Sequence, residues 1–351
     1  MSVEPVSLAL LGCAKTGDRS AAAWQQALTP FTHLEFVVSD AGRGIAAGVR
    51  ALAAARSQAS PTSIPLSHGL DVFHTAQEAQ QVLGRQWRQA EAVWEQAEAA
   101  DAATTAAKQR GYNAQKKASS AYQAWRKAEQ ALATAEQREA AWQRARAALR
   151  VFRADGTLND RAWAQAEIAA AVAELPGPEW RKTRSFLRDD RTLAFLDRLQ
   201  RRLAEAVPQQ ALRQACVRRW WLRRQRPAAA ATTAGGQVLQ LLDAVIAAGA
   251  LTAQEQAAYE RVAAVLASTV RASSAVEGIN SVLRMQQCRH RRTTQGLLDL
   301  KRLYWNCRQL PTGQRRGRSP YEMLGVALPS TDFWSLLQTS PEKLAEVVSS
   351  S

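Results

Sequence analysis

Residues 34–52, LEFVVSDAGRGIAAGVRAL, decide the fold, because they change within a few positions from a strand pattern to a helix pattern. LEFVVSD is a short apolar run rich in β-favouring residues, AGRG is a turn, and IAAGVRAL has amphipathic helical spacing. We expect further strands in VSLALL (6–11) and SIPLSHGLDVFH (63–74), and a helix over RSAAAWQQAL (19–28) capped by Asp18. The order strand, helix, strand, helix, strand predicts one mixed or parallel sheet with helical cover.

The middle of the chain, residues 84–270, is expected to be helical throughout. From Leu83 to Arg150 the sequence is rich in Ala, Gln, Glu, Arg and Lys, and Trp87 and Trp94 stand one heptad apart. This pattern predicts a long helical hairpin or short coiled coil, broken near Gly111. PGPEW (176–180) separates it from further helices. We expect the tryptophans of residues 84–270 to pack in the core, the alternative being platforms for nucleotides. The arginine cluster VRRWWLRRQR (217–226) is the exception that could contact DNA.

The C-terminal part is expected to continue as a basic helical segment, a flexible basic loop and a short helix. The loop is TGQRRGRSP (312–320), and the helix after it has Ser319 as its N-cap and Pro320 at its first position. The final residues form a polar tail. The predicted divisions are 1–83 (N-terminal part of an α/β core), 84–270 (helical insertion), 271–329 (C-terminal helical part of the core) and 330–351 (tail).

Positive charge is concentrated in two blocks. The chain of 351 residues carries 46 Lys and Arg against 31 Asp and Glu, a formal net charge of +15. Residues 201–226 and 271–325 together account for all of it, and both contain tryptophan. Such blocks are typical of a phosphate-binding surface, although arginine-rich helices can also be merely solvated. The residues that we expect to contact the DNA backbone are Arg218, Arg219, Arg289, Arg291 and Arg292.

Several other classes of protein are disfavoured. The four cysteines are scattered and form no CxxC pair, and we find neither a signal peptide nor an apolar run of membrane-spanning length. Phosphate-binding, dinucleotide-binding and serine-hydrolase motifs are absent from the sequence. Cys288, His290 and Cys307 do not have zinc-finger spacing and have no obvious fourth ligand. We therefore expect a soluble cytoplasmic protein with a polyanionic partner and no contact with membranes.

Two carboxylates carry the chemical hypothesis. Asp40 ends an apolar strand, where ligands of α/β sheets collect, although Asp before a Gly turn is also an ordinary cap. At helical spacing, Glu277, Asn280 and Arg284 fall on one face, beside an apolar stripe of neighbouring residues. An acid, an amide and a guanidinium in one row suit metal and phosphate together. The alternative is a solvated Glu277 paired with Arg284.

Taken together, VVSDAGRGIAAGVRAL, SSAVEGINSVLRMQQCRHRRTTQGLLDLKRLYWNCRQL and GRSPYEMLG resemble a bacterial insertion-sequence transposase of the DDE class. In that class the second catalytic Asp closes a strand, as Asp40 does in VVSD. The catalytic Glu opens a helix with Asn three residues on and Arg four beyond, matching Glu277, Asn280 and Arg284. The resemblance covers most of residues 1–329 and is densest at the two ends.

A second, shorter match lies between these carboxylates. LDVFH, with Asp71 and His74, resembles the [C/D]-x-x-H signature of transposases related to the mutator group. In that comparison His74 would assist at the active site. A packed core histidine is the alternative.

The resemblance implies an RNase H-like catalytic core interrupted by a large, partly coiled-coil helical insertion. It further implies Mg²⁺ or Mn²⁺ ions held by carboxylates that include Asp40 and Glu277, which would cleave and transfer DNA strands. Asn280 and Arg284 would contact the DNA with the arginines named above. The implied partner is double-stranded DNA, as transposon ends and target, with association with the nucleoid and self-association of the chain.

The resemblance also leaves one position unfilled. The family pattern has a first Asp on the first core strand, and Asp18 lies too close to Asp40 and precedes a helix. We therefore expect an N-terminally truncated transposase with impaired cleavage. Two other function classes stay open: a non-catalytic DNA-binding or coiled-coil interaction protein derived from a transposase, and an RNA-binding helical protein.

Overall fold

The computed structural model falls into two units, residues 1–71 with 270–351 (unit 1) and residues 72–269 (unit 2), each described by itself. The backbone alone is described at 234–237, 240 and 314. The structure describes residues 1–14, 16–60, 65–224, 234–271, 276, 278–281, 293–326, 328–330, 332–340 and 342–343.

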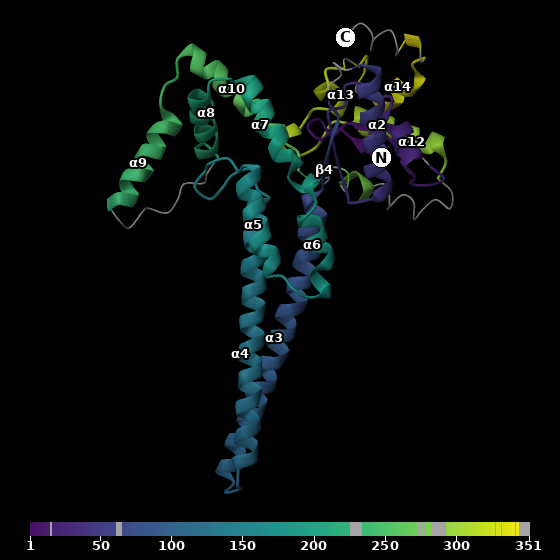
Figure 1. Ribbon diagram of the computed structural model, residues 1–351. Coiled ribbons are helices and arrows are strands. Elements are labelled where there is room, and N and C mark those ends of the chain that lie inside the picture. The colour runs from purple at the N-terminus through teal and green to yellow at the C-terminus, as the bar shows by residue number, and fades with distance from the viewer. Residues whose placement is uncertain are drawn as a thin grey trace. The chain divides into compact units, whose positions relative to one another are not determined.

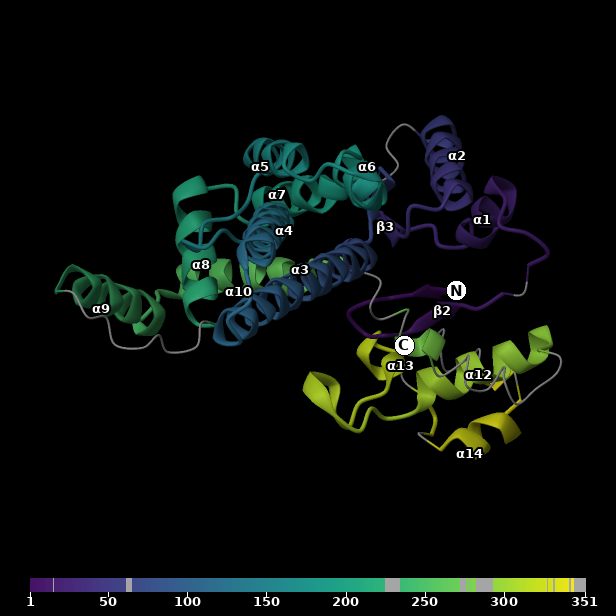
Figure 2. The ribbon, with the colours of Figure 1, turned by 90° about the horizontal axis from the view of Figure 1, so that it is seen from below.

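A β–α–β element forms the first half of unit 1. Strands β3 (Phe36–Ser39) and β4 (Ser67–Leu70) are parallel neighbours, and α2 (Arg43–Ala59) connects them. This confirms the predicted strand, turn and helix of residues 34–52. A parallel pair needs a long crossover, and a helix is its usual form. Helix α1 (Ala21–Leu28) lies beside α2 (Figure 2).

The core of this element is built from the apolar faces of α1 and α2. Leu28, Ile45, Val49 and Leu52 are buried together. The two helices approach closely at Gly48, where an added Cβ would come within 2.6 Å of the Trp24 Cβ. The expected cap of α1 was wrong by two residues. Ser20 is the N-cap, and Asp18 instead accepts from the Ser20 backbone N–H at 2.9 Å.

A second, separate sheet replaces the single sheet that the sequence predicted. Strands β1 (Ser2–Val3) and β2 (Leu10–Gly12) are antiparallel, and β3 and β4 form their own two-stranded sheet. Helix α12 (Gln295–Cys307) lies along β2 (Figure 2). The Asn306 amide binds both the N–H and the carbonyl of Leu10, at 2.8 and 3.1 Å. Because these two groups are occupied, another strand cannot pair there.

The remaining C-terminal elements are short. The predicted N-cap Ser319 and first-turn Pro320 are confirmed in α13 (Pro320–Met323), where Ser319 and Glu322 form a capping box. The expected tail of residues 330–351 contains a helix, α14 (Phe333–Gln338), whose Phe333 ring lies 5.2 Å from the Tyr304 ring in an edge-to-face contact. A short 3₁₀ turn, η3, spans Gly313–Arg315.

Two long helices dominate unit 2. Helix α3 (Val72–Gln109) and helix α4 (Gln115–Ala148) run side by side as a hairpin (Figure 1). Gly111, with a φ of 75°, lies between them, so the predicted break near this residue is confirmed. The predicted boundary between Leu83 and Gly84 falls inside α3, because helical structure already begins at Val72. The strand predicted over residues 63–74 therefore ends at Leu70, and Val72 to His74 belong to α3.

The hairpin is held by an alanine seam at heptad spacing. We define the seam as the buried heptad positions of α3 (Leu83, Ala90, Ala97 and Thr104) and those of α4 with its two cap residues (Ala114, Ala121, Ala128, Ala135, Trp142 and Leu149). Small side chains let two helices approach closely, and larger ones at Leu83, Trp142 and Leu149 fill the space towards the base. The Trp94 and Trp125 rings meet edge to face at 4.9 Å beside the seam.

The rest of unit 2 is a group of shorter helices. Trp142 and Trp180 are fully buried, which confirms the packing role expected for those tryptophans. A core of residues from α7, α8 and α10 surrounds Leu203, Val217 and Val262. The elements are α5 (Arg161–Ala173), η1 (Pro178–Trp180), α6 (Arg181–Leu187), η2 (Asp190–Leu193), α7 (Ala194–Ala206), α8 (Gln210–Leu222), α9 (Ala234–Ala248) and α10 (Ala253–Ala267). None of the described helices is both long enough and apolar enough to span a bilayer.

Candidate functional site

The carboxyl ends of β3 and β4 lie at one edge of their sheet. Their register pairs Ser39 with Leu70, so Asp40 and Asp71 follow at equivalent positions, one after each strand. The Asp71 backbone N–H extends the pairing by donating to the Ser39 carbonyl at 2.8 Å. Two of the predicted site residues are thus brought to the same edge, where parallel sheets usually hold ligands.

The two carboxylates differ in exposure. Asp40 is exposed, and its Oδ1 accepts a hydrogen bond from the Gly42 N–H at 3.2 Å. An added Cβ on Gly42 would come within 2.9 Å of that same oxygen, so the turn leaves room for the carboxylate. Asp71 is buried, at 1% exposure. Asp40 is therefore the carboxylate that solvent, a cation or a substrate can reach.

A buried serine–histidine pair lies next to Asp40, and local sequence patterns did not predict it. The Ser39 hydroxyl donates to the Asp40 carbonyl at 2.8 Å and lies 2.8 Å from His68 Nε2. Because the hydroxyl has a single proton, His68 Nε2–H donates to Ser39. The strand pattern LSHGL was the available signal, since it places His68 in register with Val37 on a paired strand. The pair stiffens the end of β3 from which Asp40 projects.

Of the other predicted site residues, the structure describes some and leaves others outside its described ranges. His74 is half-buried in the first turn of α3, with its ring 5.7 Å from that of Phe73 in an edge-to-face contact. Glu277 lies outside the described residues, as do Arg284, Arg289, Arg291 and Arg292. Asn280 is half-buried in a short described helical stretch, and its neighbour Ile279 is buried, as the predicted apolar stripe requires.

A magnesium site needs several oxygen ligands around one ion. Within the described ranges, no group of three or more His, Cys, Asp or Glu side chains is placed to hold a metal ion. Asp40 offers one exposed carboxylate. The described residues by themselves therefore do not fit the two-metal centre that the resemblance implies.

The arginines of α8 make contacts within unit 2. Arg218 pairs with Asp243 at 2.8 Å and lies over the Trp221 ring, with 4.9 Å from its Cζ to the ring centroid. Arg219 is 7% exposed, and its guanidinium donates to the Gly249 carbonyl. The expectation that Arg219 contacts phosphate is corrected, because its charge is buried against a helix end. Among the described arginines of α8 and the residues after it, Arg223 and Arg224 are exposed.

A second group of cations, in unit 1, is more accessible than the arginines of α8. Residues 300–318, which we call the basic segment, contain six Lys and Arg and no Asp or Glu. The expected flexible loop is closed: the Leu310 N–H donates to the Arg318 carbonyl at 3.0 Å, and the Gly317 N–H donates to the Leu310 carbonyl at 2.9 Å. Arg315 anchors the loop by donating to the carbonyls of Val6 and Pro5 at 2.7 and 3.1 Å.

Two guanidinium groups project from this closed loop. Arg316 and Arg318 are exposed, and neither side chain has an ion pair or hydrogen bond within the described part of the chain. Arg308 stacks on Trp305, with 4.0 Å between its Cζ and the ring centroid. An aromatic ring and several cations in one short segment are typical of a nucleic-acid surface.

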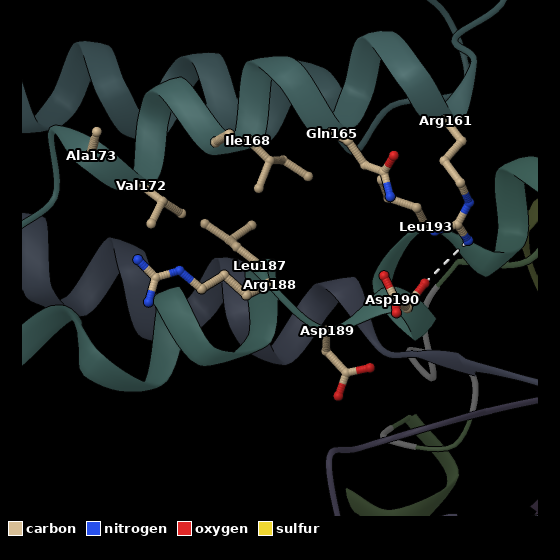
Figure 3. A pocket seen from close by; sticks show the side chains of 11 residues that line it. Arg161, Gln165, Ile168, Val172, Ala173, Leu187, Arg188, Asp189, Asp190 and Leu193 are labelled. Atoms are coloured by element: carbon tan, nitrogen blue, oxygen red, sulfur yellow. Dashed lines mark hydrogen bonds between the residues drawn. The ribbon is translucent and has the colours of Figure 1, made fainter.

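Unit 2 also contains a cavity of about 300 Å³ between α5 and the turn that follows α6 (Figure 3). Its floor is apolar, with Ile168, Val172 and Leu187. Two polar groups at its rim are paired: Arg161 donates to both carboxylate oxygens of Asp197, and Asp189 accepts from Arg191. Gln165, Arg188 and Asp190 also line the cavity.

Comparison of the chain with protein-family models, with curated proteins and with solved structures finds no match.

Proposed function

We propose that this chain binds double-stranded DNA through the basic segment of unit 1 and takes part in metal-dependent strand cleavage and transfer of the transposase type. The observation that carries the proposal is the closed loop that presents Arg316 and Arg318 in the same unit as the exposed carboxylate of Asp40. Such a protein would work on the nucleoid in the cytoplasm.

DNA binding is supported by the charge and anchoring of the loop. A phosphate backbone attracts cations without regard to sequence, and binding releases its counterions. Six cations without an acid inside the segment favour this attraction, and one of them, Arg302, also pairs with Asp299 immediately before the segment. The contacts of Arg315 with Val6 and Pro5 hold the loop against the segment between β1 and β2, so less conformational entropy is lost when Arg316 and Arg318 meet phosphate.

The chemical part of the proposal depends on Asp40. Hard oxygen ligands suit Mg²⁺ and Mn²⁺, and an exposed carboxylate at the carboxyl end of a parallel strand can supply one. Glu277 remains the predicted second ligand. Since the described residues do not complete a metal site, we assign no catalytic step to the ion.

DNA binding is tested by fluorescence anisotropy of a labelled duplex with the full chain. We expect Arg316→Ala/Arg318→Ala to weaken binding roughly 10- to 100-fold and to lower the salt slope by about 2. The matched control, Arg110→Ala/Arg126→Ala, removes the same charge from exposed positions on the hairpin and should change affinity little. If both double variants lost DNA affinity equally, the net charge of the chain, and not a defined surface, would determine binding.

Metal dependence is tested separately. We expect wild-type protein to bind Mn²⁺ in calorimetry and to nick labelled duplex only slowly when Mg²⁺ is added, because the first Asp of the family pattern is absent. Both signals should disappear in Asp40→Asn and in Glu277→Gln. DNA binding should survive in both variants. Loss of neither signal in these variants would remove the two carboxylates from the proposal.

The second candidate is a non-catalytic DNA-binding or coiled-coil interaction protein. The long α3–α4 hairpin favours it, because a helical arm of this kind offers an extended surface to a partner. DNA binding that is unaffected by chelators, together with no detectable Mn²⁺ binding, would support this candidate over the first.

A further inference from the structure

Helices α12 and α14 lie side by side in unit 1 (Figure 2) and present three aromatic side chains in contact with one another. We call Tyr304, Phe333 and Trp334 the aromatic row. The Tyr304 and Phe333 rings meet at 5.2 Å, and the Phe333 and Trp334 rings meet at 5.4 Å, both edge to face. Phe333 is half-buried, whereas Tyr304 is 49% exposed and Trp334 is 70% exposed. The two outer rings therefore remain accessible, and neither is stacked flat on Phe333.

The way α14 is anchored directs Trp334 outwards. Leu336 is the buried residue of this helix, at 1% exposure, and Asp332 caps the helix by accepting from the Ser335 N–H at 2.8 Å. Two residues correspond to about 200° of an α-helix, so Trp334 falls on the side opposite Leu336. An exposed ring on an anchored helix loses little conformational freedom when it meets a partner.

Two cations flank the aromatic row on α12. Lys301 precedes Tyr304 by three residues and Arg308 follows it by four, so all three lie on one face of the helix. The acids between residues 300 and 340 are Glu322 and Asp332, and both carboxylates accept from backbone N–H groups at helix caps. The aromatic row thus lies among cations, and the nearby acids already have partners.

This combination favours unpaired nucleotides over a neutral apolar partner. Residues 300–340 contain six Lys and Arg against two acids, a surplus that attracts a polyanion. Proteins that bind single-stranded DNA place aromatic rings beside cations, because bases stack on the rings while phosphates meet the charges. In an intact duplex the faces of the bases are covered by neighbouring bases, so exposed rings gain stacking contacts only where bases are unpaired.

We propose that the aromatic row stacks on unpaired bases of a single-stranded extension that adjoins the duplex bound by the basic segment. The inference rests on the proposed function, because it adds a contact with single-stranded DNA to the duplex contacts of Arg316 and Arg318. It names the DNA substrate as a duplex with a single-stranded flank.

Fluorescence anisotropy of the full chain with two labelled DNAs tests the stacking. One DNA is a blunt duplex, and the other is the same duplex with an extension of unpaired thymidines. We expect wild type to bind the extended duplex roughly 5- to 100-fold more tightly than the blunt one. Trp334→Ala should remove most of this preference without changing the affinity for the blunt duplex, and Trp334→Phe should keep most of it, because phenylalanine retains a ring face.

The control is Tyr122→Ala, which removes another exposed ring, 66% exposed, from unit 2 and should keep the preference. If wild type binds both DNAs equally, this inference alone is wrong. If it binds neither DNA, the proposed function fails and the inference fails with it. A self-association that Trp334→Ala abolishes, while the preference for the extended duplex stays, would assign the row to a second copy of the chain and overturn the proposal.

Photocross-linking of the wild-type chain does not depend on the folding of a variant. With 5-iododeoxyuridine in the extension, irradiation should join the base to a ring against which it is stacked. We expect mass spectrometry to find the link at Trp334 or Tyr304. Links found exclusively at other residues would contradict the stacking.

Discussion

The side-chain amide of Asn306 takes the place of a neighbouring strand for Leu10. Its Oδ1 accepts the Leu10 N–H at 2.8 Å, and its Nδ2 donates to the Leu10 carbonyl at 3.1 Å. Trp305 adds a bond from its Nε1 to the Leu8 carbonyl at 2.9 Å. A helix nearly three hundred residues later in the chain therefore satisfies the outer edge of β2, and this contact joins the two ends of unit 1.

Replacing Asn306 should weaken unit 1 strongly. Asn306→Leu keeps the volume but leaves the buried N–H and carbonyl of Leu10 without partners, at a cost of about 3 kcal/mol in unfolding free energy. Hydrogen exchange of the Leu10 amide, followed by mass spectrometry, should accelerate, and the melting temperature of unit 1 should fall. Gln295→Ala, which removes an exposed bond to the Cys13 carbonyl, is the control. Unchanged exchange at Leu10 would show that the edge is protected by other means.

The same contact explains why the sheet could not be predicted from the sequence. Local patterns identified β3, α2 and the hairpin break at Gly111, because turn residues and hydrophobic spacing act over short distances. Nothing local in VSLALL indicates that a distant asparagine occupies its edge. A single sheet was therefore predicted where the structure has two.

The arginines show a similar limit for the candidate site. The spacing of Arg218 and Arg219 beside two tryptophans is the same whether they face phosphate or the carboxyl end of a helix. Only the folded position of Gly249 decides between these roles. The basic segment could be recognised from charge, but its closed loop depends on backbone pairing between Leu310 and Arg318.

The alanine seam of the hairpin should not tolerate larger side chains. Ala97 and Ala128 are fully buried, so Ala97→Leu or Ala128→Leu should push the helices apart and cost about 1–3 kcal/mol. Thermal unfolding followed by circular dichroism measures the effect. Ala133→Leu is the control, because residue 133 is an exposed position of α4 and leucine has a helix propensity close to that of alanine. We expect it to leave the unfolding free energy unchanged. Equal stability of Ala128→Leu and Ala133→Leu would argue against a closely packed seam.

Alkaline pH should destabilise unit 1 through Cys307. Burial raises the pKa of its thiol from 9.0 to about 11, so the folded chain keeps the proton at pH values where the unfolded chain loses it. The contribution of Cys307 to the free energy of unfolding is therefore fully present below pH 9 and is lost between pH 9 and 11. The loss is roughly 2 kcal/mol at about pH 10.5.

Urea unfolding of wild type and Cys307→Ala at pH 8 and pH 10.5 isolates this contribution. The variant starts less stable because it leaves a small cavity, but its further loss at high pH should be smaller than that of wild type. Burial also raises the pKa values of Cys13 and Cys216, and both thiols remain in the two proteins. An identical alkaline loss in wild type and variant would rule out Cys307 as the source.

The shape of the basic loop, and not only its charge, should matter for DNA affinity. Gly317 has a φ of 76°, a left-handed conformation that costs about 1–2 kcal/mol for other residues, and an added Cβ would meet no atom within 4 Å. Gly317→Ala therefore strains the backbone without a clash and weakens the closure to Leu310. Under the proposed function, DNA affinity measured by anisotropy should fall several-fold with no change in charge. Gly296→Ala, in α12 and also without contacts at Cβ, should bind as wild type does. If Gly317→Ala also binds normally while Arg316→Ala/Arg318→Ala does not, the closed geometry of the loop has no part in recognition.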